Sequence, residues 1–175
     1  MSQSIVRRLA VLAGSTASLA TVGAGAFLLQ AASAIPIVKG CAIVAHPTLQ
    51  HHTSCAGEGL SRANLSRTNL SYADLTHADL SHAKLSRSDL YHANLSDASL
   101  DGANLIQAHL SRGDLTNASL AHANLSHASA RGANLSHTNL LHANLSNADL
   151  RNADLTDARF CQTTMPNGHV NNSGC

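Results

Sequence analysis

The chain has 175 residues with no tryptophan, two tyrosines and two phenylalanines, which excludes an ordinary core built on aromatic side chains. Eleven basic and ten acidic residues nearly cancel, and without Arg7 and Arg8, which a cleaved leader would remove, nine basic residues oppose ten acidic ones. This balance excludes the basic surface of a nucleic-acid-binding protein and the strong negative field of a protein that imitates DNA.

Residues 1–34 form a separate N-terminal region. A polar start ending in Arg7-Arg8 is followed by an apolar, alanine-rich run over residues 9–29 and then by an Ala-Ser-Ala triplet that ends at Ala34. This order predicts a secretory signal peptide cleaved after Ala34. The run is also long enough for an uncleaved membrane anchor, although its Ser, Thr and Gly residues make it weakly apolar. Only in that case do we expect contact with a membrane.

Residues 35–55 form an N-terminal cap segment in which cysteines and histidines lie close together. Cys41, Cys55, His46 and either His51 or His52 would supply two sulfurs and two imidazoles, a ligand set that zinc accepts in tetrahedral geometry. Their spacing differs from that of a standard zinc finger. After export, oxidation of the thiols favours a disulfide over zinc, so we expect no metal or other cofactor.

A leucine occupies every fifth position from Leu60 to Leu155, except at Ala130. Five residues advance an α-helix by about 500°, so these leucines would not share one face of a helix. In a flat strand an odd period would place successive leucines on opposite faces. Only a backbone that turns by the same amount after each five-residue unit keeps all of them inside. The period therefore predicts a solenoid.

The other positions of the unit explain how such a turn is built. The residue two before each leucine is small: Ala at sixteen of twenty positions from Ala63 to Ala158, and Thr, Ser or Gly at the rest. Residues two apart share a face in extended backbone, so this residue also points inward. The residue between them is Asn or Asp in fourteen units, and these side chains bond nearby backbone in turns. The two residues after the leucine are mostly polar, which predicts a solvated corner.

Units such as residues 73–77 (Ala-Asp-Leu-Thr-His) and 143–147 (Ala-Asn-Leu-Ser-Asn) closely resemble the A(D/N)LXX motif of the pentapeptide repeat family. The resemblance covers residues 56–160, some twenty successive units. It implies an all-β fold, a right-handed quadrilateral β-helix with four units per coil and about five coils. Ala130 would then lie between Leu110 and Leu150 in one stack, which predicts a local void or an inward shift of the coil.

Residues 161–175 form a predicted C-terminal cap. Cys161 and Cys175 follow the repeats as Cys41 and Cys55 precede them, and each pair encloses a loop of similar length. Because the open ends of a solenoid need caps, we predict disulfides Cys41–Cys55 and Cys161–Cys175, each contributing about 3 kcal/mol. Four cysteines allow three pairings, and the sequence alone does not choose among them. The tail also resembles the terminal cap of exported bacterial members of the family.

Two clusters on the outer surface follow if residues twenty apart lie above one another, as the resemblance implies. His122 would lie beside His142, where stacked imidazoles could share a transition metal or repel one another when protonated. A solvated polar surface is the simpler interpretation of these histidines. A candidate contact surface is formed by Tyr72, Tyr91, His92 and Arg112.

No catalytic constellation accompanies the repeats, because no serine lies in a strained nucleophile turn and no base is held by a third group. We therefore expect an exported, non-enzymatic structural or protein-interaction module in the cell envelope or outside the cell. Its partner would be a protein or envelope component and not a nucleic acid. The sequence indicates neither the identity of that partner nor the oligomeric state.

Two alternative functions remain at this point. Some members of the family mimic DNA and interact with gyrase, but those proteins are acidic and cytoplasmic. They also dimerise through a C-terminal helix, which the tail of this chain, with its Pro and Gly, cannot supply. The second alternative is an envelope protein that binds metal through its surface histidines.

Overall fold

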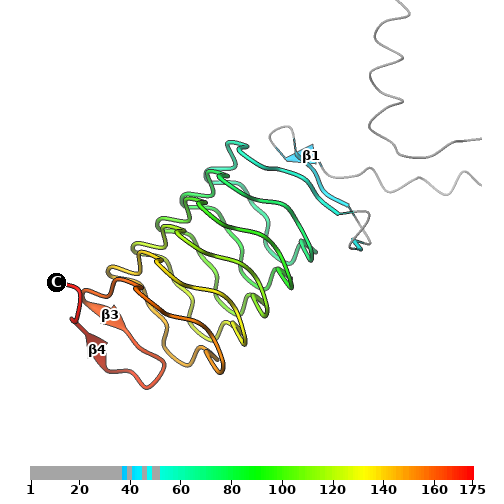
Figure 1. Cartoon of the computed structure of the whole chain (residues 1–175). Helices are drawn as coiled ribbons and strands as arrows, with labels where there is room; N and C mark the ends of the chain where they lie inside the picture. Colours follow the sequence, from blue (N-terminus) through cyan, green and yellow to red (C-terminus); the bar gives the residue numbers. More distant parts are fainter. Residues whose placement is uncertain (1–36, 39–40, 45–46, 49–51) are drawn as a thin grey trace, which may run out of the picture. The chain divides into compact units, whose positions relative to one another are not determined.

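The computed structural model describes residues 37–38, 41–44, 47–48 and 52–175. The predicted leader, residues 1–34, lies outside this part, as do His46 and His51 of the alternative zinc site. Regular strands in the described part are short. They are β1 (Ile37–Val38), β2 (Cys41–Ala42), β3 (Thr163–Thr164) and β4 (Val170–Asn171). β1 pairs antiparallel with β2, and β3 pairs antiparallel with β4 (Figure 1).

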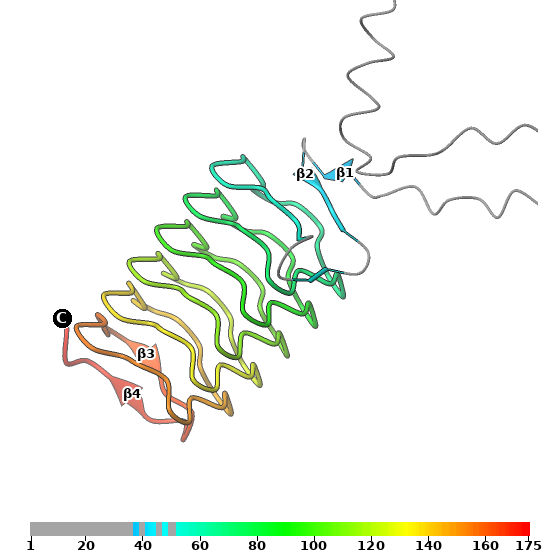
Figure 2. The same cartoon turned by 45° about the vertical axis from the view of Figure 1, so that its right-hand side comes forward.

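The body of the structure is a ladder of parallel β-bridges between residues twenty apart. The first bridge joins Ser54 to Asp74, the last joins Asn144 to Thr164, and one bridge follows at every fifth residue between them. Twenty residues therefore make one coil with four sides, and the bridged segment contains between five and six coils. The predicted right-handed quadrilateral β-helix is confirmed, with its coils stacked on one another (Figures 1 and 2). No helix in the described ranges is long and apolar enough to cross a bilayer.

Backbone hydrogen bonds hold each coil to the next. The Leu105 N–H donates to the Asn124 carbonyl (2.7 Å), and the Asn124 N–H donates to the Ala103 carbonyl (2.9 Å). The same pair of bonds recurs from unit to unit along the ladder. A single coil cannot satisfy these groups by itself, so the stability of the fold depends on stacking between neighbours.

Each unit turns at the two residues that follow its leucine. The Ala123 N–H donates to the Leu120 carbonyl (3.0 Å), which closes a β-turn around Ala121 and His122. His122 has a φ of 59°, and the equivalent residues of all units from Gly57 to Gln162 have φ between 50° and 69°. A positive φ at the third residue alone is the arrangement of a type II turn. We call this residue, the second after the leucine, the corner residue.

The Asn or Asp that precedes each leucine fixes the entry to this turn. In Asn124 the side-chain Oδ1 accepts a hydrogen bond from the Ser126 N–H at 3.1 Å, a bond that spans the leucine. All fourteen units with Asn or Asp at this position make the same bond, as the sequence predicted. Where Ser119 occupies the position, Asp101 of the preceding coil accepts from the Ala121 N–H instead (3.0 Å).

The leucines of the repeat and the small residues two positions before them fill the interior. Every leucine at the repeat position from Leu60 to Leu145 is at most 1% exposed. Ala130 is equally buried, and it lies in the stack between Leu110 and Leu150 as expected. The Leu110 N–H still donates to the Ser129 carbonyl (2.7 Å), and the Ala130 N–H donates to the Asp149 carbonyl (2.9 Å). These hydrogen bonds have the same lengths as those of the other coils, so they give no sign that the coil is shifted inward at Ala130. The alternative, a void beside Ala130, stays a prediction.

A disulfide and a hairpin close each end of the described fold. Cys41 is joined to Cys55 with 5.3 Å between their Cα atoms, and Cys161 is joined to Cys175 with 4.9 Å. This is the pairing predicted from the sequence, and it leaves no free thiolate at Cys41 or Cys55 to hold zinc. At the first end Thr53 Oγ1 accepts from the Val44 N–H (3.0 Å), which ties the segment after β2 to the first coil.

The ladder is slightly longer than the predicted repeat segment, residues 56–160. Thr53 and Cys55 occupy the small and the leucine positions of a unit before it, and both are buried. Thr163 and Met165 occupy the same two positions after it, and Thr163 is fully buried. Thr163 Oγ1 also donates to the Leu140 carbonyl (2.6 Å). The coil geometry therefore continues where the sequence motif has ended, because any side chain of suitable size can fill these positions.

Candidate functional site

One side of the β-helix carries both tyrosines of the chain. This side consists of residues 69–72 and the equivalent residues 89–92, 109–112, 129–132 and 149–152, and we call it the tyrosine face. The rings of Tyr72 and Tyr91 lie edge to face with centroids 5.9 Å apart. The His92 ring stacks on Tyr72 (5.5 Å) and meets the edge of Tyr91 (4.4 Å). Three aromatic rings from adjacent coils thus form one cluster.

Arg112 and His109 extend this cluster by one coil. Arg112 Nη1 donates to the Tyr91 hydroxyl at 3.4 Å, and the His109 ring stacks on Tyr91 with centroids 5.6 Å apart. His109 Nδ1 lies 3.2 Å from Asp89 Oδ1, which also accepts from the Tyr91 N–H. The structure therefore brings together Tyr72, Tyr91, His92 and Arg112, the residues singled out from the sequence.

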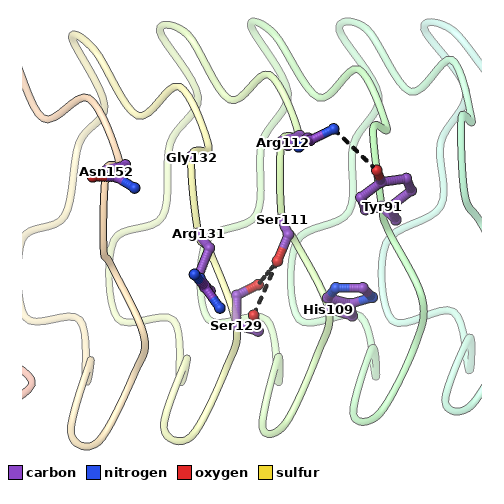
Figure 3. Close-up of a pocket in the computed structure, with 8 residues that line it drawn as sticks. All are labelled: Tyr91, His109, Ser111, Arg112, Ser129, Arg131, Gly132 and Asn152. Carbon is purple, nitrogen blue, oxygen red and sulfur yellow. Dashed lines mark hydrogen bonds between the residues drawn. The ribbon is translucent and has the colours of Figure 1, made fainter.

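A hollow of about 400 Å³ lies beside this cluster on the tyrosine face (Figure 3). Its origin is the unit at residues 128–132. Gly132 is the corner residue between Arg112 and Asn152 in its stack, and it contributes no side chain. Ser129, in the same unit, is shorter than the Asn or Asp usual at its position. The lining residues are Tyr91, His109, Ser111, Arg112, Ser129, Arg131, Gly132 and Asn152.

Some polar groups of the hollow already have hydrogen-bond partners within the protein, whereas others have few. The Ser111 and Ser129 hydroxyls bond each other at 2.9 Å. Arg131 Nε lies 3.8 Å from Asp149 Oδ2, a long contact, and its side chain is 55% exposed. Among the described residues no carboxylate lies within 4 Å of Arg112. Arg112 and Arg131 therefore keep most of their donors free for other groups.

Asp149, at the edge of the hollow, is held by a different arginine. Arg151 donates from Nε to Oδ1 (2.8 Å) and from Nη2 to Oδ2 (2.6 Å). These hydrogen bonds lower the pKa of Asp149 to about 2 and raise the pKa of Arg151. On another side of the β-helix, the Thr156 hydroxyl lowers the pKa of Asp154 through a hydrogen bond of 2.6 Å. Asp149 is thus charged and already paired at any physiological pH.

The second predicted cluster, His122 and His142, is also formed. The two rings stack with centroids 4.6 Å apart and planes within 3° of parallel. Because the nitrogen lone pairs lie in the ring planes, and the two planes are nearly parallel, the lone pairs do not converge on a shared metal ion, which needs distances near about 2.1 Å. In the part of the chain that the structure describes, no three His, Cys, Asp or Glu side chains are grouped so that they could hold a metal.

The recurrence of histidine at the corners follows from the backbone. Seven histidines are corner residues, each with φ between 56° and 59°: His77, His82, His92, His122, His127, His137 and His142. His, Asn and Asp are the residues other than glycine that adopt this left-handed conformation most readily. All seven side chains are exposed. The turn by itself therefore accounts for the choice of residue.

A family model for pentapeptide repeats matches the chain in eight copies, over residues 60–97, 98–136 and 131–165. The chain belongs to the pentapeptide repeat family. This agrees with the four-sided coils and with the motif on which the sequence resemblance rested. No match was found among curated proteins.

Several solved structures of pentapeptide repeat proteins are similar to this one. Rfr23 from the cyanobacterium Cyanothece 51142 is 35% identical over 54% of this chain and 58% of its own, with a TM-score of 0.35. HetL from Nostoc sp. strain PCC 7120, which is involved in heterocyst differentiation regulation, is 27% identical over 67% and 87%, with a TM-score of 0.26. QnrB1, a plasmid-mediated fluoroquinolone resistance protein, is 20% identical over 64% and 72%, with a TM-score of 0.31.

The sequence prediction for this pentapeptide repeat protein included only two of the eight residues that line the hollow. It named Tyr91 and Arg112 but not Arg131, Gly132 or Ser129. A signal was present, because the unit at residues 128–132 departs from the motif at Ala130 and is one of three units with a glycine corner. Aligning residues twenty apart places that unit directly beside Arg112.

Proposed function

We propose that this pentapeptide repeat protein is exported and acts as a non-enzymatic structural or protein-interaction module in the envelope or outside the cell. The tyrosine face carries the proposal. Aromatic and arginine side chains are enriched where proteins bind proteins, and this face gathers Tyr72, Tyr91 and Arg112 on a rigid support. The exposed His92 ring widens the same surface.

Export is supported by two features at different places in the chain. The predicted leader has a charged start, an apolar run and a small-residue site before residue 35. Two disulfides enclose the two ends of the repeats, and disulfides persist in oxidising compartments. The two features are independent of each other, and both favour a destination outside the cytoplasm.

A non-catalytic role is supported by the bonding of the polar groups on the tyrosine face. His109 and Asp89 form a pair, yet Ser111 bonds to Ser129 and not to the imidazole. Catalysis by a serine needs that hydroxyl on the base, with an oxyanion site beside it. The remaining carboxylate, Asp149, is neutralised by Arg151. This arrangement suits recognition better than proton transfer.

Export is tested by expressing the chain with its own leader in a bacterial host and measuring the intact mass after fractionation. We expect a form outside the cytoplasm whose mass lacks residues 1–34 and two hydrogens for each of two disulfides. A chain that starts after Ala34 is the control and should stay in the cytoplasm. Recovery of the whole chain in the cytoplasm with four free thiols would contradict the proposal.

The interaction role is tested by proximity labelling in the envelope with variants of the tyrosine face. Tyr72→Ser combined with Tyr91→Ser should abolish labelling of specific partners, because the ring cluster is lost. Ile106→Ser combined with Leu141→Ser removes large side chains that directly follow a leucine on other sides, and it should leave the labelling unchanged. Equal labelling by the parent protein and both double variants would contradict the role proposed for the tyrosine face.

A further inference from the structure

We propose that the hollow of the tyrosine face binds a carboxylate side chain from an acidic segment of a partner protein, and that Arg112 and Arg131 supply the hydrogen bonds. The inference rests on the proposed interaction function and names the chemistry of the partner. It goes beyond the ring cluster, since the hollow extends from Tyr91 over the three coils that follow.

The hollow is a built feature of the β-helix surface. All other corner residues of this side carry a side chain: Tyr72, His92, Arg112 and Asn152. A Cβ atom added to Gly132 would lie 3.8 Å from Arg112 Cγ, an ordinary van der Waals contact, so the space above Gly132 is open. The volume of about 400 Å³ is within the range of small-ligand sites and exceeds the size of one acidic side chain.

The charges of the hollow favour a single carboxylate. The carboxylate nearest to Arg131 is that of Asp149, which lies 3.8 Å away and accepts two shorter bonds from Arg151. Arg112 has a contact with the Tyr91 hydroxyl at 3.4 Å, which is long for a hydrogen bond. A guanidinium group with free donors matches the planar carboxylate, which can accept two parallel hydrogen bonds.

The surroundings favour a protein segment over a polyanion such as a nucleic acid. Asp89 and Asp149 lie in the same bridged stack as His109 and Ser129, one on each side of them. Two guanidinium groups, those of Arg112 and Arg131, lie on the two coils between them, which is enough for one carboxylate but is not the long run of positive charge that regularly spaced phosphates need. The rings of Tyr91 and His109 offer an apolar surface beside the arginines, on which the rest of an extended segment can pack.

Binding to the tyrosine face can be measured by tyrosine fluorescence. The chain has no tryptophan, and its two tyrosines, Tyr72 and Tyr91, both lie on this side, so intrinsic tyrosine fluorescence reports the tyrosine face directly. The probe is a short capped peptide with one glutamate between small apolar residues, titrated to low millimolar concentration. We expect a saturable fluorescence change with this peptide and at least tenfold weaker binding of the peptide with glutamine instead.

Two variants assign the binding to the hollow. Arg131→Gln removes a donor without touching the Tyr91 hydroxyl, and Gly132→Asn fills the space while Asn117, Asn147 and Asn152 show that this φ accepts asparagine. We expect both to weaken binding of the glutamate peptide at least tenfold with an unchanged circular dichroism spectrum. Arg67→Gln is the matched control, since it removes the same charge from a corner on another side. It should bind like the parent.

The remaining outcomes are also decisive. Free N-acetylglutamate that competes as strongly as the peptide would show a site for small organic acids, and this would overturn the part played by a protein segment. Equal binding of both peptides, or no effect of Arg131→Gln and Gly132→Asn, would overturn the carboxylate site. In that case labelling that still depends on Tyr72 and Tyr91 would leave the proposed function intact, so the two failures are distinguishable.

Discussion

Each corner residue has to adopt a left-handed backbone conformation. A left-handed φ costs about 1–2 kcal/mol for a residue other than glycine, and nineteen such residues adopt it in the part of the chain that the structure describes. Hydrogen bonds at and beside the corner offset this free-energy cost. At the corner of His122, the N–H donates to the Leu141 carbonyl of the next coil (2.8 Å), and the neighbouring Ala121 N–H is bonded by Asp101. Each net hydrogen bond contributes about 1 kcal/mol. Corners are therefore occupied mostly by His, Asn and Asp, which adopt this conformation most readily, and by exposed Arg residues.

At the residue scale, Ala130→Leu should stabilise the protein by about 1–2 kcal/mol, since it buries one more leucine in the stack between Leu110 and Leu150. The measurement is urea unfolding followed by circular dichroism. Ala133→Leu is the control, because it places the same bulk at a position where the interior holds only small residues. It should destabilise by about 1–3 kcal/mol. A clear loss of stability in Ala130→Leu would mean that no void exists beside that residue.

The caps are the elements that differ from the rest of the fold, because the coils between them are equivalent. At the C-terminal end Leu150, Leu155 and Phe160 are partly exposed, whereas the repeat leucines before them are fully buried. The chain returns over this end through the β3–β4 hairpin, and the Gly174 N–H donates to the Phe160 carbonyl (2.6 Å). The Cys161–Cys175 disulfide then holds the returning tail in place.

At the element scale, Gly174→Ala should loosen the C-terminal cap. The added Cβ atom would lie 2.9 Å from the Phe160 carbonyl oxygen and 3.0 Å from its nitrogen, both of which are backbone atoms that cannot move aside easily. We expect a loss of about 1–3 kcal/mol in urea unfolding, in the range of other overpacked sites. Ser173→Ala, at an exposed residue of the same tail, should have little effect. Equal stability of the two variants would show that the tail does not need this close contact.

The β-helix is an array in which each coil contacts only its neighbours, so its faces arise from residues twenty apart. The tyrosine face illustrates this, since Tyr72, Tyr91 and Arg112 come from three coils and meet only through stacking. Hydrogen bonds and buried leucines repeat at the same interval. Removing one full coil should therefore leave the contacts within and between the remaining coils unchanged, as expected for repeat proteins.

At the scale of the whole molecule, deletion of residues 113–132 should leave a folded β-helix that lacks the hollow. The deletion keeps Tyr72, Tyr91, His92 and Arg112 together and removes Ser129, Arg131 and Gly132. We expect a retained β-type circular dichroism spectrum, a lower melting temperature and loss of glutamate-peptide binding. Deletion of residues 113–122 is the contrast, because half a coil moves all later residues to the opposite side. An unfolded spectrum for the full-coil deletion would contradict the view that each coil depends only on its immediate neighbours.

The sequence by itself determined the solenoid, the two inward positions and the side-chain bonds of Asn and Asp. These features are local and recur in every unit, so one short pattern is tested some twenty times along the chain. It also suggested the pairing Cys41–Cys55 and Cys161–Cys175, because the cysteines flank the repeats, but the structure was needed to choose among the three possible pairings. The neighbours of Tyr91 followed once four units per coil were taken from the resemblance.

Only the tertiary structure decided the rest. The left-handed backbone of the corners, at residues such as His122 and Arg112, was not predicted from the sequence and is given by the structure. The hollow depends on the absence of a side chain at Gly132, directly beside Arg112. It also depends on Asp149 being held more closely by Arg151 (2.6 and 2.8 Å) than by Arg131 (3.8 Å). Such features come from differences between neighbouring coils and from the directions their side chains take. A repeated motif specifies what the coils share, and the site lies where they differ.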